Sequence, residues 1–109
     1  MLIDYKRDKY LSEFSHKTLQ DRYLIDGETS PQDAFARAAK AFSDNEAHAQ
    51  RLYDYASKLW FMFSTPILSN GGTTRGLPIS CFLNYVEDSR TGITNHYTEN
   101  AFLSSVGGG

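Results

Sequence analysis

The chain has 109 residues, of which 40% are hydrophobic, 14% aromatic and 22% charged. This length fits a single domain, and the aromatic content is too high for a disordered chain. Eleven basic and thirteen acidic side chains give a net charge of −2, which excludes the basic surface of a nucleic-acid-binding protein. A single cysteine excludes an internal disulfide framework, and no apolar run is long enough for a membrane helix. We therefore expect a cytoplasmic protein that binds neither nucleic acid nor membrane.

The first strong helix signal in the chain comes after its first 27 residues. Those 27 residues carry only short apolar clusters, and we expect irregular structure there with a single helical turn. Ser30 is a good N-cap, Pro31 fits the first helical position, and Asp33 places a negative charge in the first turn. Apolar residues then recur at spacings of three and four, which predicts a helix over 31–42.

A second helix is predicted over 45–63, with Asp44 as its N-cap. Its apolar residues form one stripe as far as 59–63, where every residue is apolar. A helix end without a polar face is typically buried on all sides, so we expect 59–63 to lie in the core. The short connection predicts that the two helices form an antiparallel pair, and Pro66 is expected to stop the second one.

The rest of the chain predicts a loop, one strand and one helix. Residues 69–76 are rich in glycine and hydroxyl side chains, and the loosely alternating residues 79–86 are typical of a strand covered on both faces. Asp88 or Ser89 caps a final helix over 90–105. A single strand has no hydrogen-bonding partner, and the chain ends on a glycine turn. We therefore favour a fold that further residues complete over a flexible terminal tail.

The spacing of the residues alone indicates few metal-binding, phosphate-binding or redox groups. The three histidines lie far apart without the spacing of metal ligands, which favours surface roles. The glycine-rich loop lacks the Lys-Ser/Thr pair of a P-loop, and by itself it indicates only a turn. Hydroxyl groups near this loop are nevertheless able to donate hydrogen bonds to a phosphate. These hydroxyls belong to Thr65, Ser69, Thr73, Thr74 and Ser80. Cys81 is either a small buried hydrophobic residue or, with a second thiol or a base nearby, a functional thiol.

Three motifs in register carry a family resemblance. They are Ser64-Thr65-Pro66, Ser80-Cys81 and Asp88-Ser89. Together with residues 23–29 and the run from 100 to 109, they closely resemble the large, catalytic subunit of ribonucleotide reductase, of the class I type that reduces diphosphates. The resemblance implies a mainly α-helical N-terminal domain over 1–63. It also implies that residues 64–109 begin a ten-stranded α/β barrel, which is incomplete here.

The same resemblance assigns roles to individual residues. Cys81 matches one of two cysteines that reduce the substrate and form a disulfide, later reopened by thioredoxin or glutaredoxin. Thr65 and Ser80 match positions that hydrogen-bond the phosphate and ribose of a ribonucleoside diphosphate. Gly108 and Gly109 match a turn whose backbone closely approaches the substrate.

The resemblance further implies regulation and partners. Asp88 and Ser89 match the site that recognises the sugar of a deoxynucleoside triphosphate effector, with dNTP or ATP as allosteric ligands. The helix over 90–105 matches one that packs against its counterpart in a large-subunit homodimer. The other implied partners are a separate small subunit, which generates the radical, and the rest of the large chain. No metal or cofactor is expected to bind to these 109 residues themselves.

Several parts of the family pattern are missing from these residues. They include the second reducing cysteine, the radical-carrying cysteine and the active-site asparagine and glutamate, and no ATP-cone precedes Tyr10. We therefore expect these 109 residues alone to be inactive as an enzyme. The alternative hypothesis is a small, non-catalytic helical module that binds a partner or a nucleotide.

Overall fold

The computed structural model describes all 109 residues and contains helices but no strand. Its elements are the 3₁₀ helix η1 (Tyr5–Tyr10) and the α-helices α1 (Glu13–Arg22), α2 (Pro31–Ala41), α3 (Glu46–Ser57), α4 (Thr65–Asn70) and α5 (Arg90–Ser105). The molecule measures 57 × 31 × 25 Å, and its radius of gyration is 17.5 Å. A compact chain of this length would have a radius of about 13 Å.

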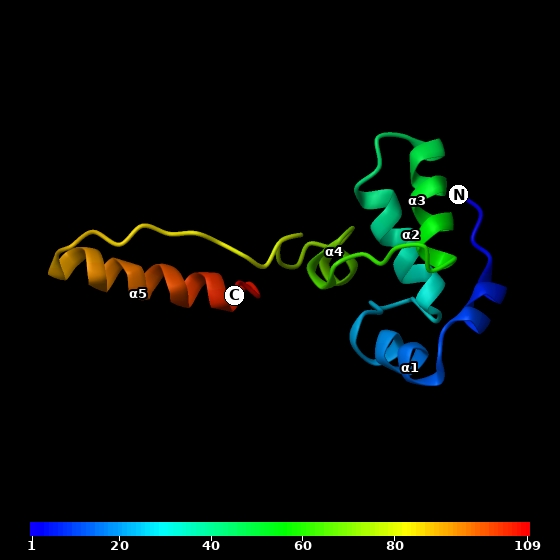
Figure 1. Cartoon of the computed structure of the whole chain (residues 1–109), viewed down its shortest axis with the longest axis horizontal. Helices are drawn as coiled ribbons and strands as arrows, with labels where there is room; N and C mark the ends of the chain where they lie inside the picture. Colours follow the sequence, from blue (N-terminus) through cyan, green and yellow to red (C-terminus); the bar gives the residue numbers. More distant parts are fainter.

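The molecule is elongated because it has two unlike parts (Figure 1). Residues 1–76, here called the body, contain η1 and α1 to α4. Residues 77–109, called the arm, contain an extended segment and α5, which run side by side away from the body. No residue after Gly71 is buried, so the whole core lies in the body.

Helix α2 is the centre of the body and packs against α3, α4, η1 and α1. It begins as the sequence predicts: Ser30 is the N-cap, Pro31 lies in the first turn, and Asp33 completes a capping box with Ser30. The predicted helix is confirmed to within one residue, because Phe42 is the C-cap. The buried face of α2 consists largely of alanines around the fully buried Phe35, so its neighbours can approach closely.

Helices α2 and α3 form the predicted antiparallel pair (Figure 1). The N-cap of α3 is Asn45 and not Asp44, since the Asn45 side chain accepts a hydrogen bond from the His48 amide at 2.9 Å. Tyr53 lies fully buried on the inner face of α3, and its hydroxyl donates to the Gln32 side chain at 2.9 Å. This bond satisfies two polar groups that would otherwise be costly to bury.

The prediction that the second helix continues to residue 63 is wrong. Helix α3 ends at Ser57. In the next turn, the backbone amide of Leu59 donates a hydrogen bond to the Ala56 carbonyl, and the amide of Trp60 donates to the Tyr55 carbonyl. This pattern is a Schellman motif, which needs a left-handed residue at the position of Leu59. Leu59 has φ = 62°, the only positive φ outside glycine in the chain.

The expected burial of residues 59–63 is also wrong for this chain. Trp60 is 67% exposed, and Leu59, Phe61 and Met62 are exposed as well. Trp60 stacks on Tyr55 with ring centroids 5.0 Å apart, and Phe61 meets Phe63 edge to face. Trp60 and Phe61 therefore pack on neighbouring aromatic rings and not on the core, whereas the half-buried Phe63 does pack against the core.

The N-terminal residues are more ordered than the sequence predicts. Instead of a single turn, they form η1 and the ten-residue helix α1, whose N-cap is Ser12. Asp8 in η1 accepts hydrogen bonds from the Ser30 hydroxyl at 2.7 Å and from the side-chain amide of Gln32 at 2.9 Å. These polar bonds hold η1 against the start of α2, a kind of contact that an apolar pattern does not reveal.

The expectation that Pro66 only stops a helix is wrong, because Pro66 lies in the first turn of a new one. Helix α4 begins at Thr65, after the N-cap Ser64, and a proline in the first turn costs no hydrogen bond. Leu68 of α4 is buried against α2. The short helix therefore fixes Thr65 at the edge of the body.

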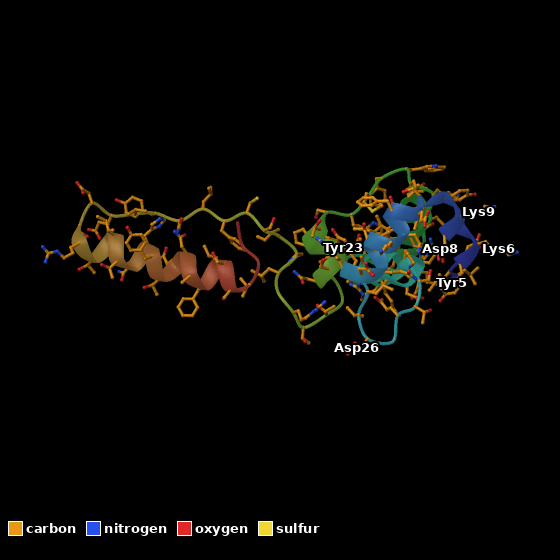
Figure 2. The ribbon with its side chains drawn as sticks, turned by 90° about the horizontal axis from the view of Figure 1, so that it is seen from below. Tyr5, Lys6, Asp8, Lys9, Tyr23 and Asp26 are labelled. Carbon is orange, nitrogen blue, oxygen red and sulfur yellow. The ribbon has the colours of Figure 1, made fainter.

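The predicted strand over 79–86 does not form. These residues are extended, but no second strand lies beside them to accept their hydrogen bonds. They lie along α5 instead, and the Asn84 side chain contacts His96 and Asn100 on α5 at 3.0 Å each. The predicted last helix is confirmed as α5, with Ser89 and not Asp88 as its N-cap. Figure 2 shows many side chains of the arm projecting outward, with no other element packed against them.

None of the six helical elements is long and apolar enough to cross a membrane.

Candidate functional site

A cleft lies where the body meets the arm. It has a volume of about 210 Å³, and it is lined by Thr65, Pro66, Ser69, Asn70, Ile79, Ser80, Val106 and Gly107. Thr65 and Ser80, two hydroxyl residues that the sequence analysis singled out, therefore face one space from different parts of the chain. The cleft is smaller than the 300–1,000 Å³ typical of a ligand site, so these residues form part of a site at most.

The glycine run closes one side of this cleft. The Gly109 amide donates to the Ser80 carbonyl, so the C-terminal end of the arm returns to the residue next to Cys81. A β-carbon on Gly108 would lie 2.9 Å from the Phe82 ring and 2.7 Å from the Leu103 carbonyl oxygen. Gly108 therefore cannot carry a side chain here. Gly107 lines the cleft itself, whereas Gly108 and Gly109 do not, although Gly109 bonds to Ser80, which does.

Arg37 holds the body's side of the cleft in place. From α2, its Nη1 atom donates to the carbonyl oxygens of Leu68 at 2.9 Å and Gly71 at 2.7 Å, at the C-terminal end of α4. Its Nε atom forms an ion pair with Glu28 at 3.0 Å, and both side chains are about one-tenth exposed. A charged guanidinium makes stronger hydrogen bonds than a neutral donor, so α4 is firmly anchored to α2.

The other predicted site residues lie in the arm. Cys81 follows Ser80 but is exposed, so it is not the buried hydrophobic residue that one of the two interpretations required. The Ser89 hydroxyl accepts from the Gly92 amide at 2.9 Å, and Asp88 is exposed beside it. The sixteen residues of α5 separate this end of the arm from Gly107 by about 24 Å. The structure therefore does not bring the predicted effector residues to the cleft.

Not every hydroxyl near the glycine-rich loop faces the cleft. Thr73 donates to the Asn70 carbonyl at 2.7 Å and so belongs to the turn itself. Thr74 lines a separate, shallow hollow beside Asp26.

The histidines show no metal site. His16 and His48 contact the carboxylates of Asp8 and Asp44. No group of three or more His, Cys, Asp or Glu side chains is arranged to hold a metal ion.

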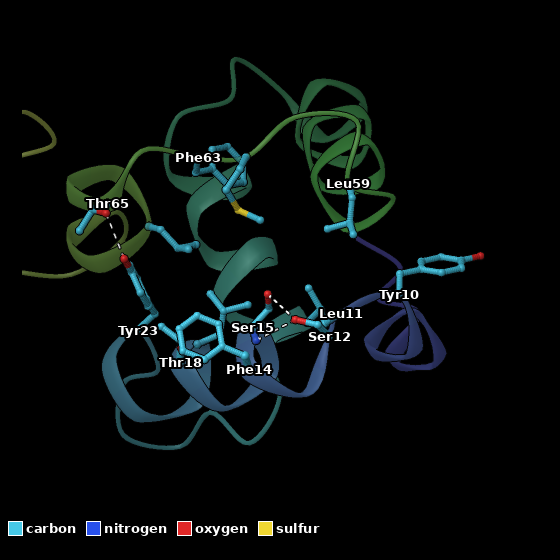
Figure 3. Close-up of a pocket in the computed structure, with 13 residues that line it drawn as sticks. Tyr10, Leu11, Ser12, Phe14, Ser15, Thr18, Tyr23, Leu59, Phe63 and Thr65 are labelled. Carbon is cyan, nitrogen blue, oxygen red and sulfur yellow. Dashed lines mark hydrogen bonds between the residues drawn. The ribbon is translucent and has the colours of Figure 1, made fainter.

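Sequence reasoning missed a second hollow, next to the cleft. This apolar groove of about 430 Å³ lies between α1, the 59–63 segment and α4 (Figure 3). Tyr23 and Thr65 both line it, and their side-chain oxygens are 3.0 Å apart. The two residues are 42 positions apart, so no local spacing could have indicated this contact.

The side chains with shifted pKa values lie in the body, away from the cleft. Burial raises the pKa of Tyr53, and a hydrogen bond to Asp54 raises the pKa of Arg7. At the start of α2, burial acts to raise the pKa of Asp33, but hydrogen bonds from Thr29, Tyr5 and Ser30 outweigh it and lower that pKa. These groups support the fold around η1, and none of them is positioned to exchange a proton with a ligand in the cleft.

Comparison with known proteins gives a consistent result. Residues 9–76 match the family model described as "Ribonucleotide reductase, all-alpha domain". The chain is 44% identical to the ribonucleoside-diphosphate reductase large subunit of Invertebrate iridescent virus 6. This match covers the whole chain and 11% of that subunit. The chain is also 34% identical to the ribonucleoside-diphosphate reductase subunit alpha of Helicobacter pylori. This match covers 95% of the chain and 14% of that subunit.

A solved structure is similar over the full chain. It is the class Id ribonucleotide reductase alpha subunit of Actinobacillus ureae, with a TM-score of 0.75 and 37% sequence identity. The match covers all of this chain and 21% of that subunit. The chain thus spans between about a tenth and a fifth of the length of these relatives.

Proposed function

The chain belongs to the ribonucleotide reductase large-subunit family, and we propose that it supplies part of the substrate site and part of the effector site of such a subunit. Family membership favours this enzyme hypothesis over a small, non-catalytic binding module. The reaction replaces the 2′-hydroxyl of a ribonucleoside diphosphate by hydrogen. Two thiols provide two electrons and two protons, the hydroxyl leaves as water, and the thiols become a disulfide.

In this proposal, the residues at the junction of body and arm bind and reduce the substrate. The observation that supports it is that Thr65 and Ser80, from opposite sides, line one cleft. Their hydroxyls bind a phosphate oxygen and the ribose, and Gly108 and Gly109 let the backbone approach the sugar closely. Cys81, next to Ser80 and exposed, is one of the two reducing thiols. Holding the sugar in one orientation matters because the reaction must take place at one carbon only.

Regulation and assembly belong to the far end of the arm. We assign to Asp88 and Ser89 the recognition of the sugar of a dNTP effector, and to α5 a contact with the same helix of a second large subunit. Ile93 and Tyr97, which are four residues apart and so lie on the same face of α5, are exposed and provide apolar surface for such a contact. The further partners we propose are a small subunit that generates the radical, thioredoxin or glutaredoxin as reductant, and the remaining segments of a large chain. The 109 residues alone are expected to reduce no ribonucleotide, because one thiol cannot form the disulfide.

The proposal is tested by Cys81→Ser in a complete large subunit that contains this segment. Deoxyribonucleotide formation is measured with the small subunit and thioredoxin, and is normalised to folded protein. We expect turnover to be lost while substrate binding persists, because serine preserves the size of the side chain but forms no disulfide. Cys81→Ala serves as the matched control for the added hydroxyl, and it should be equally inactive. Wild-type turnover in either variant would rule out the redox role of Cys81.

A further inference from the structure

The contact between Tyr23 and Thr65 joins two elements that are far apart in the sequence. Tyr23 is the C-cap of α1, whereas Thr65 is the first residue of α4. Figure 3 shows the phenol of Tyr23 directed at the Thr65 side chain across the edge of the groove, and the two oxygen atoms are 3.0 Å apart. Thr65 also lines the neighbouring cleft, so the same residue contacts Tyr23 and borders the cleft.

Arg37 holds both partners of this contact at once. Its Nη2 atom donates to the backbone carbonyl of Tyr23 at 3.0 Å, while Nη1 donates to the two carbonyl oxygens at the end of α4. Glu28 accepts from both Nε and Nη2 of Arg37 and thereby fixes the plane of the guanidinium. One rigid planar group therefore sets the separation between the Tyr23 backbone and α4.

We propose that Tyr23 is a positioning residue, which donates its phenolic hydrogen to Thr65 and thereby directs the Thr65 hydroxyl at a phosphate oxygen of the substrate. The inference rests on the proposed function of Thr65. A threonine hydroxyl has one hydrogen and two lone pairs. When Tyr23 occupies a lone pair, the hydrogen of Thr65 remains free for an acceptor in the cleft. Hydrogen bonds in such a chain also polarise and strengthen each other.

Tyr23→Phe, which removes only the hydroxyl, tests this proposal in a complete large subunit containing the segment. With CDP as substrate, we expect KM to rise roughly 2- to 10-fold, the effect of one lost hydrogen bond, with kcat unchanged. Tyr10→Phe is the matched control. Tyr10 lines the same groove, but its hydroxyl has no hydrogen-bonding partner, so KM should not change.

A double-mutant cycle with Thr65→Val separates positioning from a general structural effect. If Tyr23 acts through Thr65, the double variant has the same KM as Thr65→Val alone. Additive effects on KM, or a loss of thermal stability that accounts for the change, would overturn the positioning role. An unchanged KM in Tyr23→Phe together with a raised KM in Thr65→Val would also overturn it, and would leave the proposed function standing. An unchanged KM in Thr65→Val would instead refute the proposed role of Thr65.

Discussion

The ion pair between Arg37 and Glu28 is largely buried in the body, and we expect its removal to destabilise the fold strongly. Arg37→Met preserves the aliphatic stem but removes the donors to the carbonyl oxygens of Tyr23, Leu68 and Gly71. The Glu28 carboxylate, whose side chain is only about one-tenth exposed, then loses the cation that pairs with it. Breaking a buried ion pair on one side costs about 3–5 kcal/mol. A chain of this length has a total stability of about 5–15 kcal/mol, so the loss is a large fraction of it.

Urea unfolding followed by far-ultraviolet circular dichroism measures this effect, because the body is helical. Arg51→Met is the matched control, since Arg51 is exposed on α3 and forms no ion pair or side-chain hydrogen bond. That variant should change the free energy of unfolding by less than about 0.5 kcal/mol. The double variant Arg37→Met/Glu28→Gln should recover part of the loss, because it removes the unpaired charge. The reasoning is refuted if Arg37→Met and Arg51→Met have equal stability.

Two further predictions concern the start of α2 and the arm. Because the folded pKa of Asp33 is lowered, its stabilisation is complete above the ordinary Asp pKa of about 4 and disappears as the pH falls through the folded value. The difference in urea midpoint between the wild type and Asp33→Asn should therefore shrink as the pH falls from about 7 to about 3, and a constant difference would contradict this role. In hydrogen exchange, the amides of α5 should exchange much faster than those of α2, because no residue of the arm is buried. A chain ending at Gly76 should accordingly melt at the temperature of the whole chain.

Helices with strong local signals could be predicted from the sequence. The capping residues Ser30 and Ser89 mark the starts of α2 and α5, because the side chain of an N-cap bonds to an amide only two or three residues away. Helix α1 was missed since it buries only Leu19 and therefore shows no apolar stripe. The end of α3 was misplaced because its left-handed position carries Leu59, where glycine would have given the signal.

The candidate site was predictable only in part. The motifs containing Thr65, Ser80 and Cys81 could be recognised, and the structure brings the first two to one cleft. The roles of Tyr23 and Arg37 could not be predicted, because their partners are long-range: Arg37 reaches the end of α4 across more than 30 positions. The expected strand failed for a related reason. Pairing depends on another strand, and the extended segment finds only the polar side chains of α5.

The two sides of the cleft, α4 of the body and the arm, differ in how firmly they are attached to the core. Thr65 lies on α4, which the buried Leu68 and the largely buried guanidinium of Arg37 fix to the core. Ser80 lies on the arm, and near the cleft the side-chain amide of Asn70 in the body donates a hydrogen bond of 2.8 Å to the Leu77 carbonyl of the arm. A functional site must hold its groups to within about 0.5 Å, which an arm without buried residues does not achieve alone. The apolar side chains of the arm and of residues 59–63 are exposed, and under the proposed function they would pack against the remaining segments of a large chain. The chemistry proposed for Cys81 thus requires that the arm be held against the body more firmly than its exposed residues hold it here.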